Sequence, residues 1–204
     1  MTPKLYFVAG APALVWRSAR PWLAISSGPL GGGIGERSWV INATVPPSYD
    51  RDDPDEHLRE MAADLGTIGV GTGLLTAVDV RKVCHRNDSG VLASVTTGLG
   101  GMPTWAAAPG PTVDYASGTI NAVCFLPVRL SEAALVNAVS VVAEAKAQAL
   151  FDAKVPGTGT CTDATVLLCP TDGPAEPYGG TRSAIGAPLA RAVHAAVLAE
   201  LSPD

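Results

Sequence analysis

The sequence has few aromatic residues and few charges. Aromatic side chains make up 5% of its 204 residues and charged side chains 16%, whereas hydrophobic types make up 47%. A chain this apolar can bury a substantial core, which disfavours intrinsic disorder. We treat residues 1–204 as a single domain, with residues 1–20 as a peripheral N-terminal segment.

Clusters of basic residues and long apolar runs are also missing. The net charge is −5 and Lys and Arg are scattered, so the electrostatic footprint of a nucleic-acid-binding protein is absent. No uninterrupted apolar stretch reaches the length of about 18 residues that a spanning helix needs. We therefore expect neither a nucleic-acid partner nor a membrane partner.

Metal-ligand spacings are lacking as well. The cysteines form no C-x-x-C pair, which disfavours a zinc knuckle and fits a reduced, cytoplasmic setting. The histidines show no H-x-x-x-H spacing, so we predict no metal site. No G-x-S-x-G elbow marks a serine nucleophile. The residues concerned are Cys84, Cys124, Cys161, Cys169, His57, His85 and His194.

The order of the expected elements predicts a mixed α/β (α+β) fold, a single layered domain with helices packed on mixed sheets. An α-β-β-α sandwich fits that order. Residues 68–83 predict a strand, a turn and a second strand, 85–90 a turn, and 98–118 a long ordered loop. Strands are expected at 22–26, 38–45, 91–97, 119–128 and 164–169, and helices at 56–65, 131–153 and about 184–201.

The long helix at 131–153 carries two kinds of polar residue. At 100° per residue, Asn137, Ser140, Glu144 and Gln148 fall within one stripe about 80° wide, which is either a solvated face or part of a site. Lys146 lies about 160° away from that stripe, among Val and Ala. A lysine on an apolar face either extends its ammonium to solvent or pairs with a carboxylate.

The stretch Gly157-Thr-Gly-Thr-Cys-Thr162-Asp163 resembles a phosphate-binding loop only superficially. Thr162 stands where the dinucleotide-binding pattern needs its third glycine, and the Walker pattern lacks its lysine. Two interpretations remain open. Asp163 caps backbone amides in a hydrogen-bonded turn, or the hydroxyls and Asp163 act on a substrate.

Two asparagines, Asn42 and Asn121, stand inside otherwise apolar strands. Buried amides need hydrogen-bond partners, so these side chains either hold the structure together or face a ligand. Thr76 and Asp79 follow the glycine-rich stretch at residues 69–73, where the missing side chains allow a ligand to approach the backbone closely.

Several segments, in this order, resemble the adenosylcobinamide amidohydrolases of corrinoid salvage, over about residues 22–197. The pairing of E-A-K with G-T-x-T-D-A is the most specific part of the resemblance. The segments are Gly31-Gly-Gly33, Val40-Ile-Asn42-Ala-Thr-Val45, Gly71-Thr-Gly-Leu-Leu-Thr76-Ala-Val-Asp79-Val80, Gly118-Thr-Ile-Asn121, Ala143-Glu-Ala-Lys146, Gly157-Thr-Gly-Thr-Cys-Thr162-Asp163-Ala164, Tyr178-Gly-Gly-Thr181 and Ile185-Gly186.

Three features depart from the family pattern. Ala143 stands where the family usually has Thr before E-A-K. Cys161 occupies a variable place, so its thiol is not a family nucleophile. The first 20 residues match nothing in the pattern.

The resemblance implies hydrolysis of the amide that joins a corrin propionate side chain to aminopropanol in adenosylcobinamide. The products would be adenosylcobyric acid and 1-amino-2-propanol, and no cofactor is implied. We hypothesise that Lys146 and Asp163 meet at one wall of the site. Asp163 or Glu144 would activate water, Lys146 would polarise the carbonyl or protonate the amine, and Thr162 or Thr160 would be the nucleophile on a covalent path.

The substrate-binding residues expected from the same motifs are Gly32, Gly33, Asn42, Thr76, Asp79, Asn121 and Thr160. Two other classes stay open at this stage. One is an N-terminal-nucleophile or aminopeptidase-like hydrolase, and the other is a non-catalytic corrinoid-binding protein. The Ala-rich helices are also compatible with a homo-oligomer.

Overall fold

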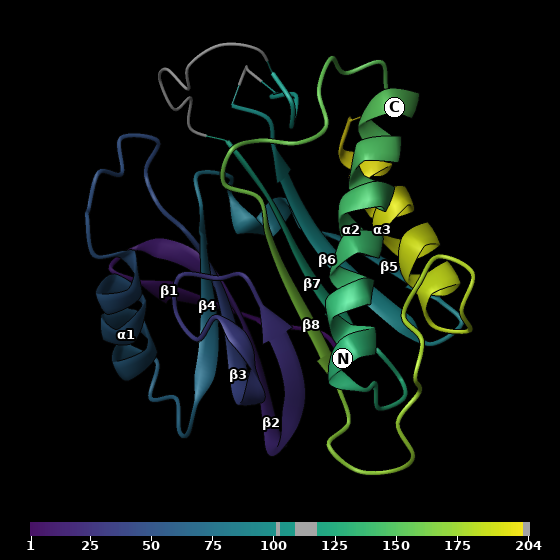
Figure 1. Cartoon of the computed structure of the whole chain (residues 1–204). Helices are drawn as coiled ribbons and strands as arrows, with labels where there is room; N and C mark the ends of the chain where they lie inside the picture. Colours follow the sequence, from purple (N-terminus) through teal and green to yellow (C-terminus); the bar gives the residue numbers. More distant parts are fainter. Residues whose placement is uncertain (101–102, 109–117, 202–204) are drawn as a thin grey trace.

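One mixed eight-stranded sheet runs through the molecule, which we describe from a computed structural model covering residues 1–100, 103–108 and 118–201 (Figure 1). The strands follow the order β4-β3-β2-β8-β7-β6-β5, and β1 pairs with β2. The pairs β3–β4 and β7–β8 are parallel, and the other pairs are antiparallel. The strands are β1 (Lys4–Val8), β2 (Ala11–Ser26), β3 (Gly33–Thr44), β4 (Gly71–Thr76), β5 (Cys84–Asp88), β6 (Val91–Gly98), β7 (Thr119–Phe125) and β8 (Ala164–Cys169).

Within the described residues the helices are α1 (Pro54–Asp64), α2 (Glu132–Asp152) and α3 (Gly186–Leu201), together with a short 3₁₀ helix η1 (Val80–Lys82). The prediction of a mixed α+β fold with helices on a mixed sheet is confirmed. The strands form one continuous sheet, whereas an α-β-β-α sandwich has two.

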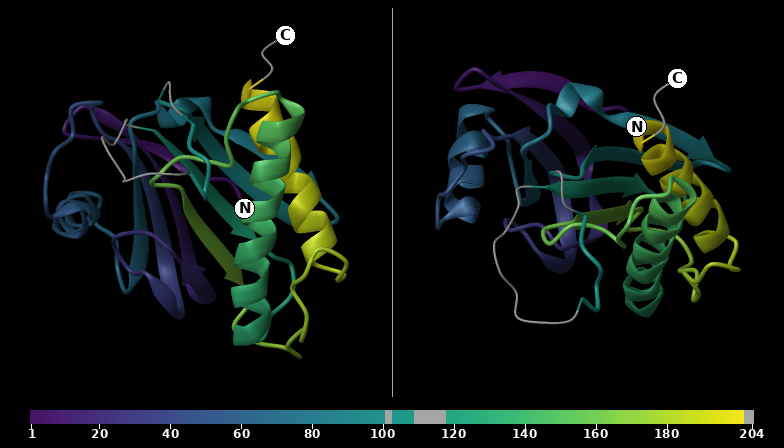
Figure 2. Two further views of the ribbon diagram at one scale, coloured as in Figure 1. Left: turned by 45° about the horizontal axis from the view of Figure 1, so that its top comes forward. Right: turned by 90° about the horizontal axis from the view of Figure 1, so that it is seen from above.

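The sheet is so strongly curved that its two halves face each other (Figure 2). Between them lies an inner core that combines Val40 and Leu74 from one half with Val123 and Leu168 from the other. Asn42 of β3 bonds directly to Asn121 of β7, although β2 and β8 separate these strands in the sheet. Apolar burial on this concave face therefore holds the two halves of the sheet together.

Helices cover the outer face of the sheet. Helix α1 packs Leu58 and Met61 against β2 and β3, and the adjacent helices α2 and α3 pack against β6, β7 and β8 (Figures 1 and 2). Ser131 caps α2 by accepting a hydrogen bond from the amide of Ala134.

Helix α2 is apolar and long enough, by composition and length alone, to cross a membrane. In the fold it is a core helix, because Leu135, Val141 and Leu150 are buried against the sheet and α3. Its opposite face exposes Asn137 and Glu144.

The N-terminal segment is not peripheral. Residues 4–8 form β1, and β2 extends from residue 11 to residue 26, with Val15 and Trp16 buried in the core. Charged and proline residues interrupt the apolar pattern of β2, which explains why only residues 22–26 were expected to be a strand.

Other differences concern element boundaries. Helix α1 begins at Pro54, two residues before the expected start at residue 56, because proline is favoured in the first helical turn. Residues 68–83 form only one strand, β4, followed by η1. The expected turn at 85–90 is mostly the edge strand β5.

Candidate active site

Two cavities lie on opposite faces of the sheet where β7 and β8 begin. The larger, about 380 Å³, opens on the concave side and is lined by Thr119, Asn121 and Thr162 among others. The smaller, about 180 Å³, lies under α2 and α3 and is lined by Lys146 and Asp163 among others. Because successive side chains of a strand point to opposite faces, β7 and β8 form the wall between the two cavities.

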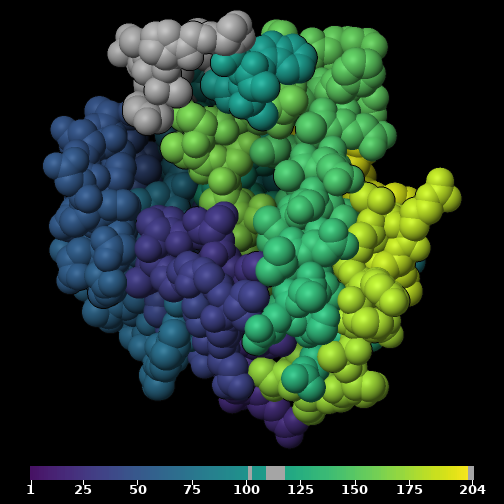
Figure 3. Space-filling view, in the orientation of Figure 1, coloured from purple at the N-terminus to yellow at the C-terminus, as the bar shows by residue number. Residues whose placement is uncertain are grey.

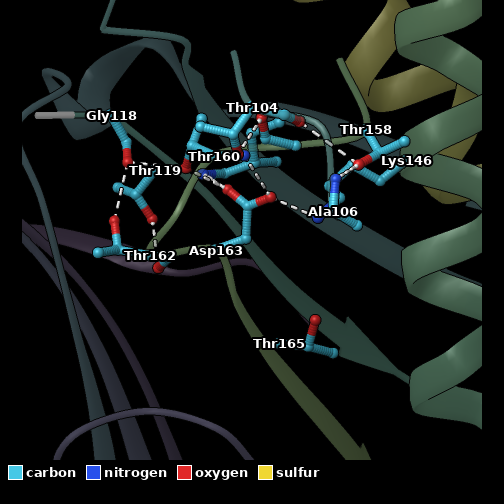
Figure 4. Close-up of polar contacts among 12 residues, drawn as sticks. Thr104, Ala106, Gly118, Thr119, Lys146, Thr158, Thr160, Thr162, Asp163 and Thr165 are labelled. Atoms are coloured by element: carbon cyan, nitrogen blue, oxygen red, sulfur yellow. Dashed lines mark hydrogen bonds and ion pairs between the residues drawn. The ribbon is translucent and has the colours of Figure 1, made fainter. Parts of the chain in front are cut away.

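The smaller cavity contains an ion pair between Lys146 of α2 and Asp163 (Figure 4). Its walls are mostly apolar, with Ile120 and Ala122 from β7 and valines from α2 and α3. The side chains of Lys146 and Asp163 are only 16% and 13% exposed. The expected contact between these two residues is therefore present, and the apolar surroundings strengthen their mutual attraction.

Asp163 is held by more than the lysine. Its Oδ1 accepts hydrogen bonds from the Ile120 amide at 2.8 Å and the Thr160 hydroxyl at 2.6 Å, and its Oδ2 accepts one from the Thr160 amide at 3.0 Å as well as that of Lys146. The pairing of β7 with β8 begins at Asn121 and Ala164. Just before it, the Asp163 carboxylate accepts the hydrogen bond of the β7 amide at Ile120. These contacts hold the Asp163 carboxylate in one orientation.

Gly159 leaves the space that the ion pair needs. A Cβ at this position would lie within 3.0 Å of both Asp163 Oδ2 and Lys146 Nζ. The same glycine joins the loop that carries Thr104, whose amide donates to the Gly159 carbonyl at 2.7 Å. The Gly-Thr-Gly-Thr stretch is therefore a packed turn around the ion pair.

The two threonines of this turn take different places (Figure 4). Both hydroxyls lie within hydrogen-bond distance of the Gly118 carbonyl, at 2.7 Å for Thr160 and 2.8 Å for Thr162. The Thr160 hydroxyl also lies beside Asp163, whereas Thr162 lines the other cavity. The structure thus brings together Lys146, Asp163 and Thr160, and it separates Thr162 from them. Residues 161–162 form a turn before β8 begins at Ala164, and this turn carries Thr162 to the other side of the β7–β8 wall.

Glu144 does not join this group. It lies in the exposed stripe of α2 with Asn137, Ser140 and Gln148, and it lines neither cavity. The stripe is therefore a solvated face of the helix, the simpler of the two interpretations.

The larger cavity adjoins a network of buried amides and hydroxyls. The Asn121 amide donates to Asn42 Oδ1 and to the Leu75 carbonyl, both at 3.0 Å, and the Asn42 amide donates to Thr96 Oγ1 at 3.2 Å. Asn42 is 2% exposed and Asn121 1%. Asn42 and Asn121 thus hold the two halves of the sheet together, and Asn121 also lines the cavity with Thr76.

Five of the expected binding residues line neither cavity, namely Gly32, Gly33, Asn42, Asp79 and Thr160. Gly32 ends the connection between β2 and β3, and Gly33 is the first residue of β3. In this connection the Gly31 carbonyl accepts two hydrogen bonds from the buried guanidinium of Arg37. Asp79 caps η1 and binds Arg81, whose guanidinium lowers the pKa of Asp79 to about 2.

Sequence reasoning missed other residues that surround the site. Ser27 lines both cavities, and Thr119 lies within hydrogen-bond distance of Asn121 Oδ1 and of the Thr162 carbonyl. Tyr49 lines the larger cavity, and its hydroxyl lies 3.0 Å from His57 Nδ1. Serine and tyrosine in proline-rich connections give no periodic signal, so nothing in the sequence marked them.

None of the four cysteines lines either cavity. Cys124 is fully buried, and burial raises its pKa to about 12, so it stays protonated. Cys161 is exposed. Over the described ranges, with gaps at 101–102, 109–117 and 202–204, there is no group of three or more His, Cys, Asp or Glu side chains that could hold a metal ion.

Comparison with known proteins adds to this geometry. The family model "Adenosylcobinamide amidohydrolase" matches residues 3–202. The chain belongs to the adenosylcobinamide amidohydrolase family. It is 31% identical to the adenosylcobinamide amidohydrolase of Methanosarcina mazei over 83% of this chain and 85% of that protein. It is 33% identical to the one of Halobacterium salinarum over 85% of this chain and 80% of that protein.

Membership of the adenosylcobinamide amidohydrolase family makes the chain an amidohydrolase and confirms the resemblance expected from the motifs. It does not favour an N-terminal-nucleophile hydrolase or a non-catalytic binding protein. The match begins at residue 3, so the first 20 residues, which were expected to lie outside the family pattern, fall within it.

Proposed function

We propose that this chain hydrolyses the amide between the corrin propionate side chain and aminopropanol in adenosylcobinamide, in corrinoid salvage. The observation that carries the proposal is the Lys146–Asp163 ion pair in a small, largely apolar cavity. A cavity of about 180 Å³ is too small for a corrin ring. It suits the aminopropanol arm, so the ring lies outside against the surface.

Lys146 polarises the substrate carbonyl. Its ammonium has three protons, and over the described residues Asp163 is its only hydrogen-bond acceptor. The other protons are available to the carbonyl oxygen, where negative charge develops when the carbonyl carbon is attacked. A fixed cation in an apolar cavity stabilises that charge more strongly than it would in water.

Asp163 holds Lys146 in place and takes the proton of the attacking water. It is the carboxylate lining the smaller cavity. Water adds to the carbonyl carbon and gives a proton to Asp163, and the tetrahedral intermediate then breaks its C–N bond. The proton passes to the leaving amine, which gives 1-amino-2-propanol and the carboxylic acid of adenosylcobyric acid. Thr160 stays bound to Asp163 and fixes its orientation.

The test is incubation of the purified chain with adenosylcobinamide. We expect stoichiometric release of 1-amino-2-propanol and a corrinoid with one new carboxylate, both measured by mass spectrometry. The intact protein mass is expected to equal that of the full chain, whereas an N-terminal-nucleophile enzyme cleaves itself before a Ser or Thr. Absence of both products with adenosylcobinamide and with cobinamide would refute the proposal.

A further inference from the structure

The larger cavity has the size and lining of a site for a neutral small molecule. Its volume of about 380 Å³ lies within the range of about 300–1,000 Å³ that such sites occupy. In Figure 3 the surface is hollowed between the blue segment that precedes α1, the purple loop after β2 and the yellow-green segment before β8. The ion pair of the smaller cavity lies on the other side of the wall formed by β7 and β8.

The lining carries no charged side chain among the described residues. Phosphate or carboxylate groups would lose their hydration there without a compensating cation, so anionic ligands are disfavoured. Apolar contacts come from Val45, Leu74 and Leu75 and from four prolines. The ligand therefore has a mostly apolar body.

Neutral hydrogen-bonding groups line the same space. The Thr76 hydroxyl accepts from the Val78 amide at 3.1 Å and the Ser27 hydroxyl from the Thr165 amide at 2.9 Å. Neither hydroxyl has an acceptor for its own proton among the residues that the structure describes, so each can donate to a ligand. Tyr49 adds an aromatic ring at the proline-rich side. A flat heterocycle with acceptor nitrogens, joined to a sugar, matches this combination.

The position of the larger cavity relative to the smaller one indicates which part of the substrate the larger cavity would bind. The two cavities meet at Ser27, which lines both. In adenosylcobinamide the adenosyl group and the aminopropanol arm project from opposite faces of the corrin plane. A corrin whose edge lies near Ser27 would therefore send these two groups to opposite sides of the wall.

We propose that the larger cavity binds the 5′-deoxyadenosyl group of the substrate. The inference rests on the proposed function, because it divides one substrate between two cavities. The nucleoside would contribute binding energy that the substrate and the transition state share. The contacts that distinguish adenosylated from non-adenosylated corrinoids would then lie on the opposite side of the β7–β8 wall from the reacting bond.

The direct test uses free 5′-deoxyadenosine as the probe, in calorimetric titration of the whole chain. The variant Ala77→Phe fills the larger cavity, because Ala77 lines it. Ala133→Phe is the matched control, since Ala133 is exposed on α2 and lines neither cavity. We expect wild type and Ala133→Phe to bind the nucleoside equally and Ala77→Phe to bind it at least about tenfold more weakly. Should the Phe side chain prevent folding, Ala77→Leu provides a smaller filling of the same space.

Kinetics give a second reading. Ala77→Phe is expected to raise KM for adenosylcobinamide about tenfold while kcat stays within about threefold, because Lys146 and Asp163 are untouched. The proposal is overturned if wild type does not bind 5′-deoxyadenosine, or if Ala77→Phe binds it as well as wild type does. If wild type hydrolyses no corrinoid, the proposed function fails, and the titration still decides whether the cavity is a nucleoside site.

Discussion

At the scale of single residues, the glycine at position 159 determines whether the ion pair can form. Its missing side chain leaves room for Asp163 and Lys146, which approach each other from a turn and from the middle of α2. Glycine is needed at position 159 for space and not for its backbone conformation, because Gly159 is not among the glycines with positive φ.

Gly159→Ala should therefore impair catalysis more than it impairs folding. The added Cβ would lie within 3.0 Å of Asp163 Oδ2 and Lys146 Nζ, so the pair must move. A displaced catalytic group commonly costs about 10²-fold in rate, and we expect kcat for adenosylcobinamide to fall at least tenfold. Steady-state kinetics and a urea unfolding curve measure both effects.

Gly180→Ala is the matched control. The closest contact of its Cβ would be Asn137 Oδ1 at 3.0 Å, the end of an exposed side chain that can move aside. Its kcat should remain within about twofold of wild type. Unchanged kcat in Gly159→Ala would show that the close approach has no catalytic role.

The residue-scale predictions from the sequence succeeded where periodicity carried the information. The position of Lys146 on an apolar helix face predicted either that its ammonium extends to solvent or that it pairs with a carboxylate, and the structure shows the pair with Asp163. The separation of Thr160 from Thr162 could not be predicted, because it depends on the turn at residues 161–162, which precedes β8 and has no periodic pattern.

At the scale of elements, an ion pair fastens α3 to the edge of the sheet. Asp88 at the end of β5 accepts hydrogen bonds from the Arg191 guanidinium at 2.6 and 2.7 Å. This guanidinium, with help from the Ser89 hydroxyl, lowers the pKa of Asp88 to about 2 from its ordinary 3.8. The contact joins segments that are far apart in the sequence.

This shift predicts how stability depends on pH. Because the pKa of Asp88 is lower in the folded state, its ionised form stabilises the fold above about pH 4, and this contribution is lost as the pH falls towards 2. Asp88→Asn should therefore lower the urea midpoint at pH 7, and the difference from wild type should shrink at pH 3. An equal difference at both pH values would contradict this assignment.

The elements found from the sequence are those with a continuous pattern. The apolar run at 164–169 lies between an aspartate and a proline, and the strand there has the predicted bounds. Residues 85–88 of β5 read His-Arg-Asn-Asp, a polar pattern that predicts a turn. They form an edge strand instead, and an edge strand needs no apolar alternation.

At the scale of the whole molecule, the curvature of the sheet creates the site. It brings β3 and β7 together, so that Asn42 and Asn121 bond across the concave face at 3.0 Å. One side of the β7–β8 wall then faces the larger cavity and the other side faces α2. Pairings such as β2 with β8, which join distant parts of the chain, could not be predicted from local pattern.

A double-mutant cycle tests this connection. Asn42→Ala and Asn121→Ala each leave a buried partner without its hydrogen bond, which costs about 1–3 kcal/mol in the free energy of unfolding. The coupling energy between the two substitutions is expected to be about 0.5–3 kcal/mol, measured by urea unfolding. Strict additivity would mean that the two asparagines do not act together.

The most direct measurement of the central claim is the initial rate of adenosylcobinamide hydrolysis by Lys146→Met and Asp163→Asn, with Glu144→Gln as the control on the solvated face of the same helix. Circular dichroism and the unfolding midpoint establish that each variant is folded. We predict that the first two variants lose at least about 10²-fold in kcat and that Glu144→Gln stays within about threefold of wild type. Near-normal turnover by a folded Lys146→Met or Asp163→Asn variant would contradict the account.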